Sequence, residues 1–391
     1  MSAETAAAPK REGREGRGPQ PASRTASLLL FGKGNVGAEV LAQLASIPGR
    51  PARLAGLCDS RRAICAEGPK ASLDPLRWKA ALLGARTEPA TIARAEALLD
   101  RLVESTSESI LISESARSTP VLVDCSAADG MEAVYRAAFA RGVHVVTANK
   151  KPLAIPWDQR VQLFDAARAN GCAFLYETTV GAALPVIGPL RDLLATGDVV
   201  DRIEASLSGT LGYLCGELQR GVPLSVAVAR ARAAGYTEPH PRDDLSGVDV
   251  ARKALILARE LGLPLQLSDV ALVPFADPGP TGEADPERFL ARLRLGDDAL
   301  AARVEENRKQ GRVLRYLARI RGGEGSRSKV LVGPAWVAGD HPAAPLQGTE
   351  AQVAIWSRRY PGPPLRVQGP GAGAAVTAAG VLADVLRIAG R

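Results

Sequence analysis

Acidic residues and a lysine gather in one stretch of the chain, which reads GYTEPHPRDDLSGVDVARK over residues 235–253. Asp249 and Lys253 are four residues apart, so a helix would place both side chains on one face. Such a group of carboxylates and an amine is a candidate for proton transfer. A solvated loop before a helix explains the same residues, with Ser246 and Asp249 as a capping box and the Asp249–Lys253 pair as an ordinary surface ion pair. This stretch alone leaves both interpretations open.

A second candidate site is the glycine loop GKGNVG, which directly follows an apolar strand and opens a helix. Gly32 permits a tight turn, Gly34 lets the backbone approach a pyrophosphate, and Gly37 lets the helix pack closely on the strand. The first residues of the helix, Asn35 and Val36, offer unpaired N–H groups and the positive end of the helix dipole. This context favours dinucleotide binding over a glycine-rich turn without a ligand.

The choice between NAD and NADP depends on Asp59, which ends the second expected strand 22 residues after Gly37. An acid at this position binds the ribose 2′-hydroxyl of NAD. Arg61 and Arg62 follow at once, and an arginine there can hold the 2′-phosphate of NADP. The two signals conflict; Arg61 tips the expectation slightly toward NADP and leaves NAD open.

Further polar side chains stand at the ends of expected elements. Lys150 lies in TANKKP, at the carboxyl end of a parallel strand, where ligands of doubly wound sheets collect. A lysine there can reach substrate and nicotinamide together, although a solvated lysine is the alternative. Ser208 and Thr210 offer hydroxyls at the start of a helix, where packing or capping would explain them equally.

The elements that must position these residues follow a clear order. Residues 1–25 are rich in Ala, Gly, Pro and charge, and are expected to form a disordered tail. Over 26–152, continuous apolar strands alternate with helical patterns, which predicts an α/β fold with a Rossmann-type, doubly wound parallel sheet. The pattern loosens over 153–365 into a second α+β unit. Residues 366–391 are expected to form a strand, loop and helix that return to the nucleotide-binding unit.

Composition argues against several classes of protein. The net charge is +7, but basic residues are spread among nearly as many acids and aromatic residues are only 4%, so no nucleic-acid partner is expected. The five cysteines show no CxxC pairing, which argues against zinc and disulfides. No apolar run of about 18 residues and no secretory signal is present, so no membrane contact and a cytoplasmic location are expected.

Seven segments of the chain resemble homoserine dehydrogenase in their order and approximate spacing, from about residue 27 to the end. They are GKGNVG, VDCS, VVTANKKP, LYETTVGAALPVI, LSGTLGYL, GYTEPHPRDDLSGVDVARKALILARE and GPGAGAAVTAAGVLADVLR. The block with YTEP and RDDLSGVDVARK is specific to this family, far more than the glycine loop. The resemblance implies reversible interconversion of L-homoserine and L-aspartate 4-semialdehyde with NADP or NAD.

The resemblance also assigns roles within the first candidate site. It makes Lys253 the catalytic acid/base, while Asp249 holds the substrate and sets the charge state of the lysine. Glu238 accepts the substrate ammonium group, and Lys150 lies between nicotinamide and substrate. Donors around Ser208 and Thr210 are expected, from the chemistry, to bind the substrate carboxylate.

Other matched positions concern the cofactor and a cation. Ser126 matches a hydroxyl residue near the nicotinamide ribose, and Gly373 precedes the helix that returns to the cofactor unit. Some family members bind a monovalent cation such as sodium, mostly through backbone carbonyls, at positions that match Glu177, Val180, Ala182 and Leu184.

The chain departs from the family pattern at His240, where related YTEPDPRDD sequences have aspartate. From the end of the sequence at Arg391 we expect the dehydrogenase module alone, without a sensing domain or an aspartate kinase module. Activity is therefore expected to be insensitive to millimolar threonine, except by weak competition with homoserine. The resemblance also implies a homodimer assembled through residues 153–365, the catalytic unit. Two alternatives are a regulatory protein that senses NAD(P) without turnover and another oxidoreductase of small amino or hydroxy acids.

Overall fold

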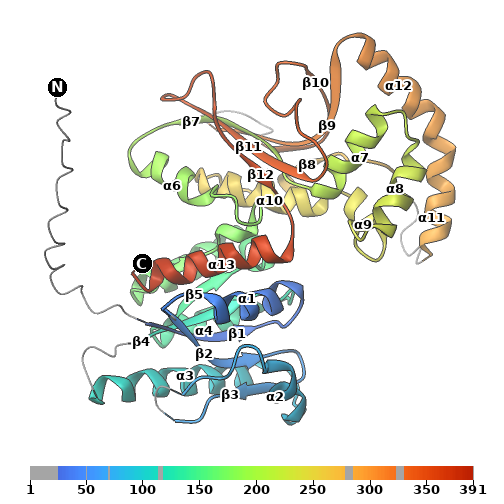
Figure 1. The fold of residues 1–391 in the computed structure, drawn as a ribbon. Helices are drawn as coiled ribbons and strands as arrows, with labels where there is room; N and C mark the ends of the chain where they lie inside the picture. Colours follow the sequence, from blue (N-terminus) through green and yellow to red (C-terminus); the bar gives the residue numbers. More distant parts are fainter. Residues whose placement is uncertain are drawn as a thin grey trace, which may run out of the picture.

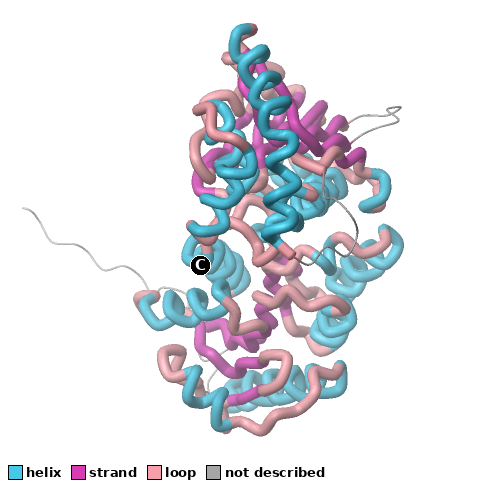
Figure 2. The backbone as a smooth tube through the Cα atoms, turned by 90° about the vertical axis from the view of Figure 1, so that its right-hand side faces the viewer, coloured by secondary structure: helices cyan, strands magenta, loops and turns pink. Residues whose placement is uncertain are grey.

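The computed structural model describes residues 25–49, 51–68, 71–112, 118–277, 285–322 and 330–390. Within these ranges the chain forms two six-stranded sheets, and Figure 1 shows them one above the other, each with its own helices. Figure 2, turned by 90°, shows the same two-part arrangement. The predicted tail lies outside the described residues, except for Thr25, which begins the first strand.

The first sheet has the strand order β3-β2-β1-β4-β5-β6, and its order reverses between β1 and β4. All neighbouring strands are parallel except the edge pair β2 and β3, so the doubly wound sheet is confirmed with one antiparallel edge. The strands are β1 (Thr25–Phe31), β2 (Ala52–Cys58), β3 (Ala63–Cys65), β4 (Ser118–Asp124), β5 (His144–Thr147) and β6 (Phe174–Leu175). The helices that accompany them are α1 (Asn35–Ser46), α2 (Trp78–Gly84), α3 (Ile92–Ile112), α4 (Met131–Ala140) and α5 (Trp157–Ala169).

The apolar run in β1 reflects burial on both faces of the sheet. Leu28 and Leu30 pack into one cluster with α1, whereas Leu29 and Phe31 pack into another cluster with α3 and α4. Alternate side chains of a strand point to opposite faces, so a strand covered on both sides needs apolar residues throughout.

The second sheet has the order β12-β11-β7-β9-β10-β8 and is antiparallel except where β8 pairs with β10. Its strands are β7 (Val200–Ser206), β8 (Ala271–Leu272), β9 (Arg312–Arg321), β10 (Val330–Ala338), β11 (Glu350–Ser357) and β12 (Leu365–Pro370). The helices of this unit are α6 (Ile187–Ala195), α7 (Gly209–Gln219), α8 (Leu224–Ala233), α9 (Pro241–Leu245), α10 (Val248–Glu260), α11 (Pro286–Leu293) and α12 (Asp297–Lys309).

The chain crosses between the two units at different points from those predicted. The first sheet extends past residue 152, because β6 at Phe174–Leu175 pairs with β5. The strand predicted near 366 to return to the nucleotide-binding unit instead pairs with β11 in the second sheet. Only helix α13 (Ala374–Ile388) returns, and its buried Val381 and Val385 pack in one cluster with residues of α1. Figure 1 shows α13 between the two sheets.

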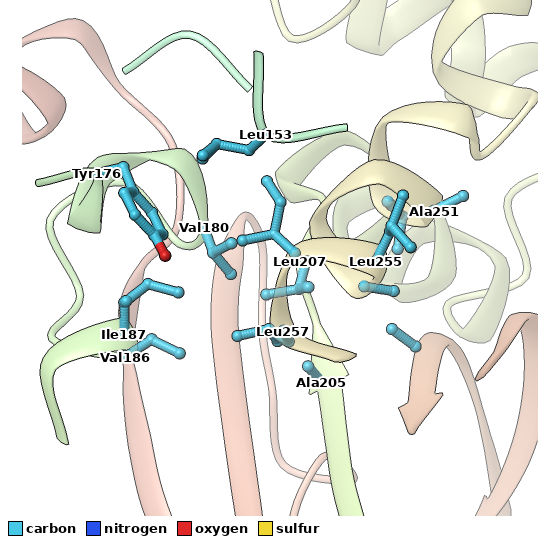
Figure 3. Packing of buried hydrophobic residues seen from close by; sticks show 14 of the residues in the cluster. Leu153, Tyr176, Val180, Val186, Ile187, Ala205, Leu207, Ala251, Leu255 and Leu257 are labelled. Atoms are coloured by element: carbon cyan, nitrogen blue, oxygen red, sulfur yellow. The ribbon is translucent and has the colours of Figure 1, made fainter. Parts of the chain in front are cut away.

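One buried cluster joins the two units. It contains Leu122 of the first sheet, Ile320 of the second and Leu255 of α10. Figure 3 shows part of it, with Tyr176 and Val180 on one side and Ala251 and Leu255 of α10 on the other. The continuous core holds α10 against the carboxyl end of the first sheet.

Among the described residues, no helix has the length and apolar character that a membrane span needs.

Candidate active site

Asp249 binds two lysines that come from different units. Its Oδ1 lies 2.8 Å from Nζ of Lys150, which follows β5, and its Oδ2 lies 2.9 Å from Nζ of Lys253, one turn later on α10. Nζ of Lys253 also donates a 2.7 Å hydrogen bond to the carbonyl of Leu207, just after β7. The structure therefore brings together the three residues predicted to carry the chemistry.

The electrostatics of this cluster favour a lysine that can release its proton. Burial lowers the pKa of Lys253, and the charge of Lys150 acts in the same direction, whereas Asp249 opposes both. Burial would raise the pKa of Asp249, but Lys253 and Lys150 outweigh it and hold that pKa well below its ordinary value. Asp249 consequently stays ionised, and the amine of Lys253 releases its proton more readily than an ordinary lysine does.

Helix α10 begins differently from the predicted capping box. Its N-cap is Gly247, with φ of 73° and no side-chain cap, and the hydroxyl of Ser246 accepts a hydrogen bond from the N–H of Val248. A Cβ on Gly247 would lie 1.9 Å from the hydroxyl of Tyr316. The capping box is therefore wrong, because the turn between α9 and α10 needs a left-handed glycine in a tight space.

His240 takes the place of the expected aspartate as the N-cap of α9. Its Nδ1 accepts a 3.2 Å hydrogen bond from the N–H of Arg242, as an aspartate oxygen would at that position. The ring packs edge-on against Phe289 at 5.5 Å between centroids. The substitution keeps the cap and removes the negative charge.

Asp244 of α9 is a residue to which sequence reasoning assigned no role. Its Oδ2 accepts a 2.8 Å hydrogen bond from the N–H of Glu238, and its Oδ1 lies 3.2 Å from the hydroxyl of Thr210. Burial raises the pKa of Asp244, and the charges of Glu238 and Asp249 add to that effect. The only sequence signal was its place in the acidic run beside Asp243.

The side chains predicted to bind substrate differ in whether their polar groups are already hydrogen-bonded within the protein. The Glu238 side chain is exposed, so it is accessible to a ligand. The Thr210 hydroxyl lies 2.5 Å from the carbonyl of Tyr236, so its proton is used inside the protein. Ser208 accepts from the N–H of Leu211 as the N-cap of α7, and no acceptor for its own proton is found among the residues that the structure describes. The hydrogen bond from Thr210 to Tyr236 therefore connects the GYTEP segment with α7.

The glycine loop has the geometry of a dinucleotide-binding turn. Gly32 has φ of 91°, and a Cβ there would lie 2.6 Å from the backbone nitrogen of Ser126. A Cβ on Gly37 would lie 1.9 Å from the carbonyl oxygen of Gly32. At Gly34 a Cβ would meet nothing within 4 Å, so packing inside the protein does not require that glycine. The space above Gly34, at the N-terminus of α1 that begins with Asn35 and Val36, suits a pyrophosphate.

Comparison with known proteins identifies the family. Residues 32–177 match the family described as homoserine dehydrogenase, NAD binding domain, and residues 185–386 match homoserine dehydrogenase. The homoserine dehydrogenase of Emericella nidulans is 37% identical over 92% of this chain and 97% of its own length. The chain belongs to the homoserine dehydrogenase family.

Two further similarities of this homoserine dehydrogenase family member are to a longer protein and to a solved structure. A bifunctional aspartokinase/homoserine dehydrogenase of Haemophilus influenzae is 43% identical over 68% of this chain, which covers 32% of that protein. The chain thus spans about a third of the length of such bifunctional relatives. A crystal structure of a Candida auris protein of unknown function has a TM-score of 0.80 and 32% identity, and it covers 94% of this chain and 99% of that one.

In this family member, a cavity of about 520 Å³ opens beside the glycine loop. Its wall includes Gly32, Lys33, Asp59 and Ser126. Asp59 Oδ2 lies 2.8 Å from Nζ of Lys33, and its Oδ1 accepts from the N–H groups of Arg61 and Arg62 at 2.7 Å. Burial opposes these contacts, but together they hold the pKa of Asp59 below its ordinary value. The cavity fits the adenosine side of a dinucleotide at the point where the strand order reverses.

The basic residues at this cavity are not those that the sequence singled out. Arg61 is not among the residues of the wall, and its recorded contact with Asp59 is through the backbone. Arg94 of α3 does line the cavity, and its guanidinium donates to the carbonyls of Asp59 and Glu88 at 2.5 and 2.7 Å. Arg94 lies 35 residues after Asp59 with no motif around it, so only the fold reveals it. Gly373, the N-cap of α13, is also absent from this wall.

The segment matched to a cation site in other family members forms a buried turn. The Glu177 carboxylate accepts from three backbone N–H groups at the start of α6, those of Val186, Ile187 and Gly188, at 2.6, 2.6 and 2.8 Å. Its carboxylate is thereby committed to capping that helix. Ala182 has a φ of 56°, and no hydrogen bond to the carbonyl oxygens of Val180, Ala182 or Leu184 is found among the described residues. Backbone carbonyls, rather than Glu177 oxygens, are the available ligands.

Proposed function

We propose that this protein interconverts L-homoserine and L-aspartate 4-semialdehyde with NAD or NADP. The observation that carries the proposal is the Asp249 carboxylate, which joins Lys150 of the NAD-binding unit to Lys253 of α10. This places two amines and a permanent anion at the carboxyl end of the first sheet, where a nicotinamide and a small polar substrate would meet.

Lys253 acts as the acid/base in this proposal. When homoserine is oxidised, its carbinol carbon loses a hydride and its hydroxyl loses a proton, which leaves the aldehyde. The bound nicotinamide supplies the hydride chemistry. Neutral Lys253 accepts the proton, and Asp249 stabilises the ammonium that forms. In the reverse direction the same lysine returns the proton to the carbonyl oxygen.

The remaining residues orient the amino acid. The exposed Glu238 carboxylate accepts the substrate ammonium group, while Asp244 holds the backbone of Glu238 in place through its N–H. Ser208, whose hydroxyl has no acceptor within the described part of the chain, donates to the substrate carboxylate from the start of α7. Lys150 binds the reacting oxygen or the nicotinamide ribose from the other side.

A spectrophotometric assay tests the proposal directly. We expect oxidation of NADPH or NADH with aspartate semialdehyde, and no comparable rate with a panel of 2-oxo acids. A higher rate with a 2-oxo acid would assign the chain to another substrate. Tight cofactor binding without turnover on any of these substrates would indicate a cofactor-sensing protein.

Lys33 is the residue that we expect to control the choice of cofactor. It neutralises Asp59, which would otherwise repel a 2′-phosphate, so Lys33→Ala should lower the ratio of kcat/KM for NADP to that for NAD. A charge-assisted hydrogen bond contributes about 1.5–3 kcal/mol, which corresponds to roughly tenfold or more. Arg61→Ala is the companion variant. If Arg61→Ala changes this ratio of kcat/KM values and Lys33→Ala does not, Arg61 rather than Lys33 controls the choice of cofactor.

We also propose that sodium binds to the carbonyl oxygens of Val180, Ala182 and Leu184. The buried left-handed turn at Ala182 and the absence of other partners for these oxygens in the described chain support it. A cation that binds only the folded state raises stability, so Tm should be about 2 °C or more higher in sodium chloride than in tetramethylammonium chloride of equal ionic strength. Equal Tm values in the two salts would argue against the site.

The homodimer is a further part of the proposal, with the second unit as the interface. Sedimentation equilibrium at micromolar protein measures it directly, and a monomer at all concentrations would exclude it. A cytoplasmic location remains a prediction from the sequence.

A further inference from the structure

A buried polar network lies directly beneath the turn that carries Lys150. Asp124, at the end of β4, is fully buried, as is Tyr135 of α4. The Tyr135 hydroxyl donates a 2.5 Å hydrogen bond to Asp124 Oδ2 and lies 2.8 Å from the hydroxyl of Thr147, the last residue of β5. None of these three side chains reaches the proposed substrate contacts.

The same carboxylate holds the two loops that follow β4 and β5. Asp124 Oδ1 accepts from the N–H of Ser126 at 2.8 Å, and its Oδ2 accepts from Nδ2 of Asn149 at 3.3 Å. Nδ2 of Asn149 also donates to the carbonyl of Ala128 at 2.8 Å. One buried carboxyl group thus connects the segment that begins at Ser126 with the residue that precedes Lys150.

The backbone around Lys150 is held on both sides by this network. The N–H of Asn149 donates to the Thr147 hydroxyl at 2.9 Å, and Oδ1 of Asn149 accepts from the N–H of Lys151 at 3.1 Å. Between these two fixed residues, Lys150 extends toward Asp249. The network therefore fixes the backbone from which the Lys150 side chain extends, and so the direction in which that side chain leaves the turn.

We infer that Tyr135 and Asp124 are positioning residues, which set the place of Lys150 relative to the nicotinamide and to Asp249. This inference rests on the proposed function. A carboxyl group buried in an apolar sheet is costly, because it must be removed from water. Packing alone would be served by Phe at 135, since the ring already contacts Phe174 edge-on at 5.7 Å between centroids. The hydroxyl and the carboxylate therefore serve the loops rather than the core.

Tyr135→Phe tests the inference, with Tyr176→Phe as its matched control. Tyr176 is also buried, also packs against Phe174, and also donates a 2.5 Å hydrogen bond to a buried carboxylate, that of Glu260. Both variants lose this bond, and both lose further contacts of the hydroxyl: that of Tyr135 with Thr147, and those of Tyr176 with Arg160 and Arg191. The loss of stability in Tyr176→Phe should therefore be at least as large as that in Tyr135→Phe. Only Tyr135→Phe should reduce kcat, by about tenfold, because small misplacements of catalytic groups are costly. Its KM for homoserine should change by less than about threefold, since the Glu238 loop is untouched.

Thr147→Val provides a second variant of the same network, which removes the hydroxyl between Tyr135 and Asn149 at nearly constant shape. It should lower kcat in the same way, and it replaces Tyr135→Phe if that protein does not fold. Wild-type kcat in both network variants, or an equal loss in Tyr176→Phe, would overturn the inference.

An NMR measurement that does not depend on catalysis separates this inference from the proposed function. Reductive methylation with ¹³C-formaldehyde gives each lysine an NMR signal, and loss of a signal in Lys150→Ala identifies that of Lys150. We expect this signal to shift in Tyr135→Phe and to stay in place in Tyr176→Phe. If the wild type lacks homoserine activity but the signal shifts, the proposed function fails and the positioning role stands. An unmoved signal would contradict the positioning role whatever the substrate.

Discussion

Lys253→Ala is expected to fold and to bind cofactor but to lose turnover by roughly 10²–10⁴-fold, the usual contribution of a general acid/base. Nζ of Lys253 touches only the Asp249 carboxylate and the Leu207 carbonyl among the described residues, so its removal leaves the core of α10 intact. Without the amine, the hydroxyl proton of homoserine has no acceptor with a suitable pKa.

Steady-state kinetics in both directions, together with fluorescence titration of NADPH, measure these effects separately. Lys151→Ala is the matched control, because Lys151 pairs with the exposed Asp129 at 2.8 Å on the far side of the same turn as Lys150. It should keep near wild-type kcat. A Lys253→Ala protein with more than about a tenth of wild-type activity would falsify the acid/base role, given that range.

Asp249→Asn is expected to have the second large effect, a fall in kcat/KM of about 10²-fold or more. Asp249 is the only anion shown in contact with both Lys150 and Lys253 in the described chain. The asparagine keeps the shape of the side chain but leaves two ammonium groups facing each other without a counter-charge. Both the position and the charge state of the lysines should change.

The pH profile of this variant gives the sign of the electrostatic effect. Asp249 favours the charged form of Lys253 and so raises its pKa against the effect of burial. Oxidation of homoserine needs the neutral amine, so the rate rises with pH through that pKa. In Asp249→Asn the pKa falls, and the rise should move to lower pH.

Asp243→Asn is the control for this experiment, because it removes the same charge from an exposed position in the neighbouring helix α9. Its profile should overlay that of the wild type. A profile of Asp249→Asn that stays in place or moves to higher pH would show that Lys253 is not the group that titrates.

Several features of the molecule could be predicted from short stretches of the sequence. The glycine loop and the apolar run of β1 predicted a parallel sheet with a dinucleotide turn, because strand burial and helix–strand packing leave periodic signals over a few residues. The pairing of Asp249 with Lys253 was likewise local, since one helical turn separates them.

Other features depended on neighbours that local sequence does not reveal. Strand β12 resembled the start of a nucleotide-binding element, yet it joined the second sheet, because its edge pairs with β11. The capping box failed for a similar reason, since Tyr316 of β9 leaves room only for glycine at 247. Arg94 reaches the cofactor cavity only because α3 packs beside the glycine loop.

By itself, the sequence determined the family, the nucleotide-binding sheet and the residue types that the chemistry requires. Only the tertiary structure decided that Lys150 and Lys253 share one carboxylate, and that Asp124 and Tyr135 lie beneath the turn of Lys150. The physical reason is that these contacts join residues far apart in the chain. Their geometry follows from how two units pack through a common core, and no short pattern of side chains records that packing.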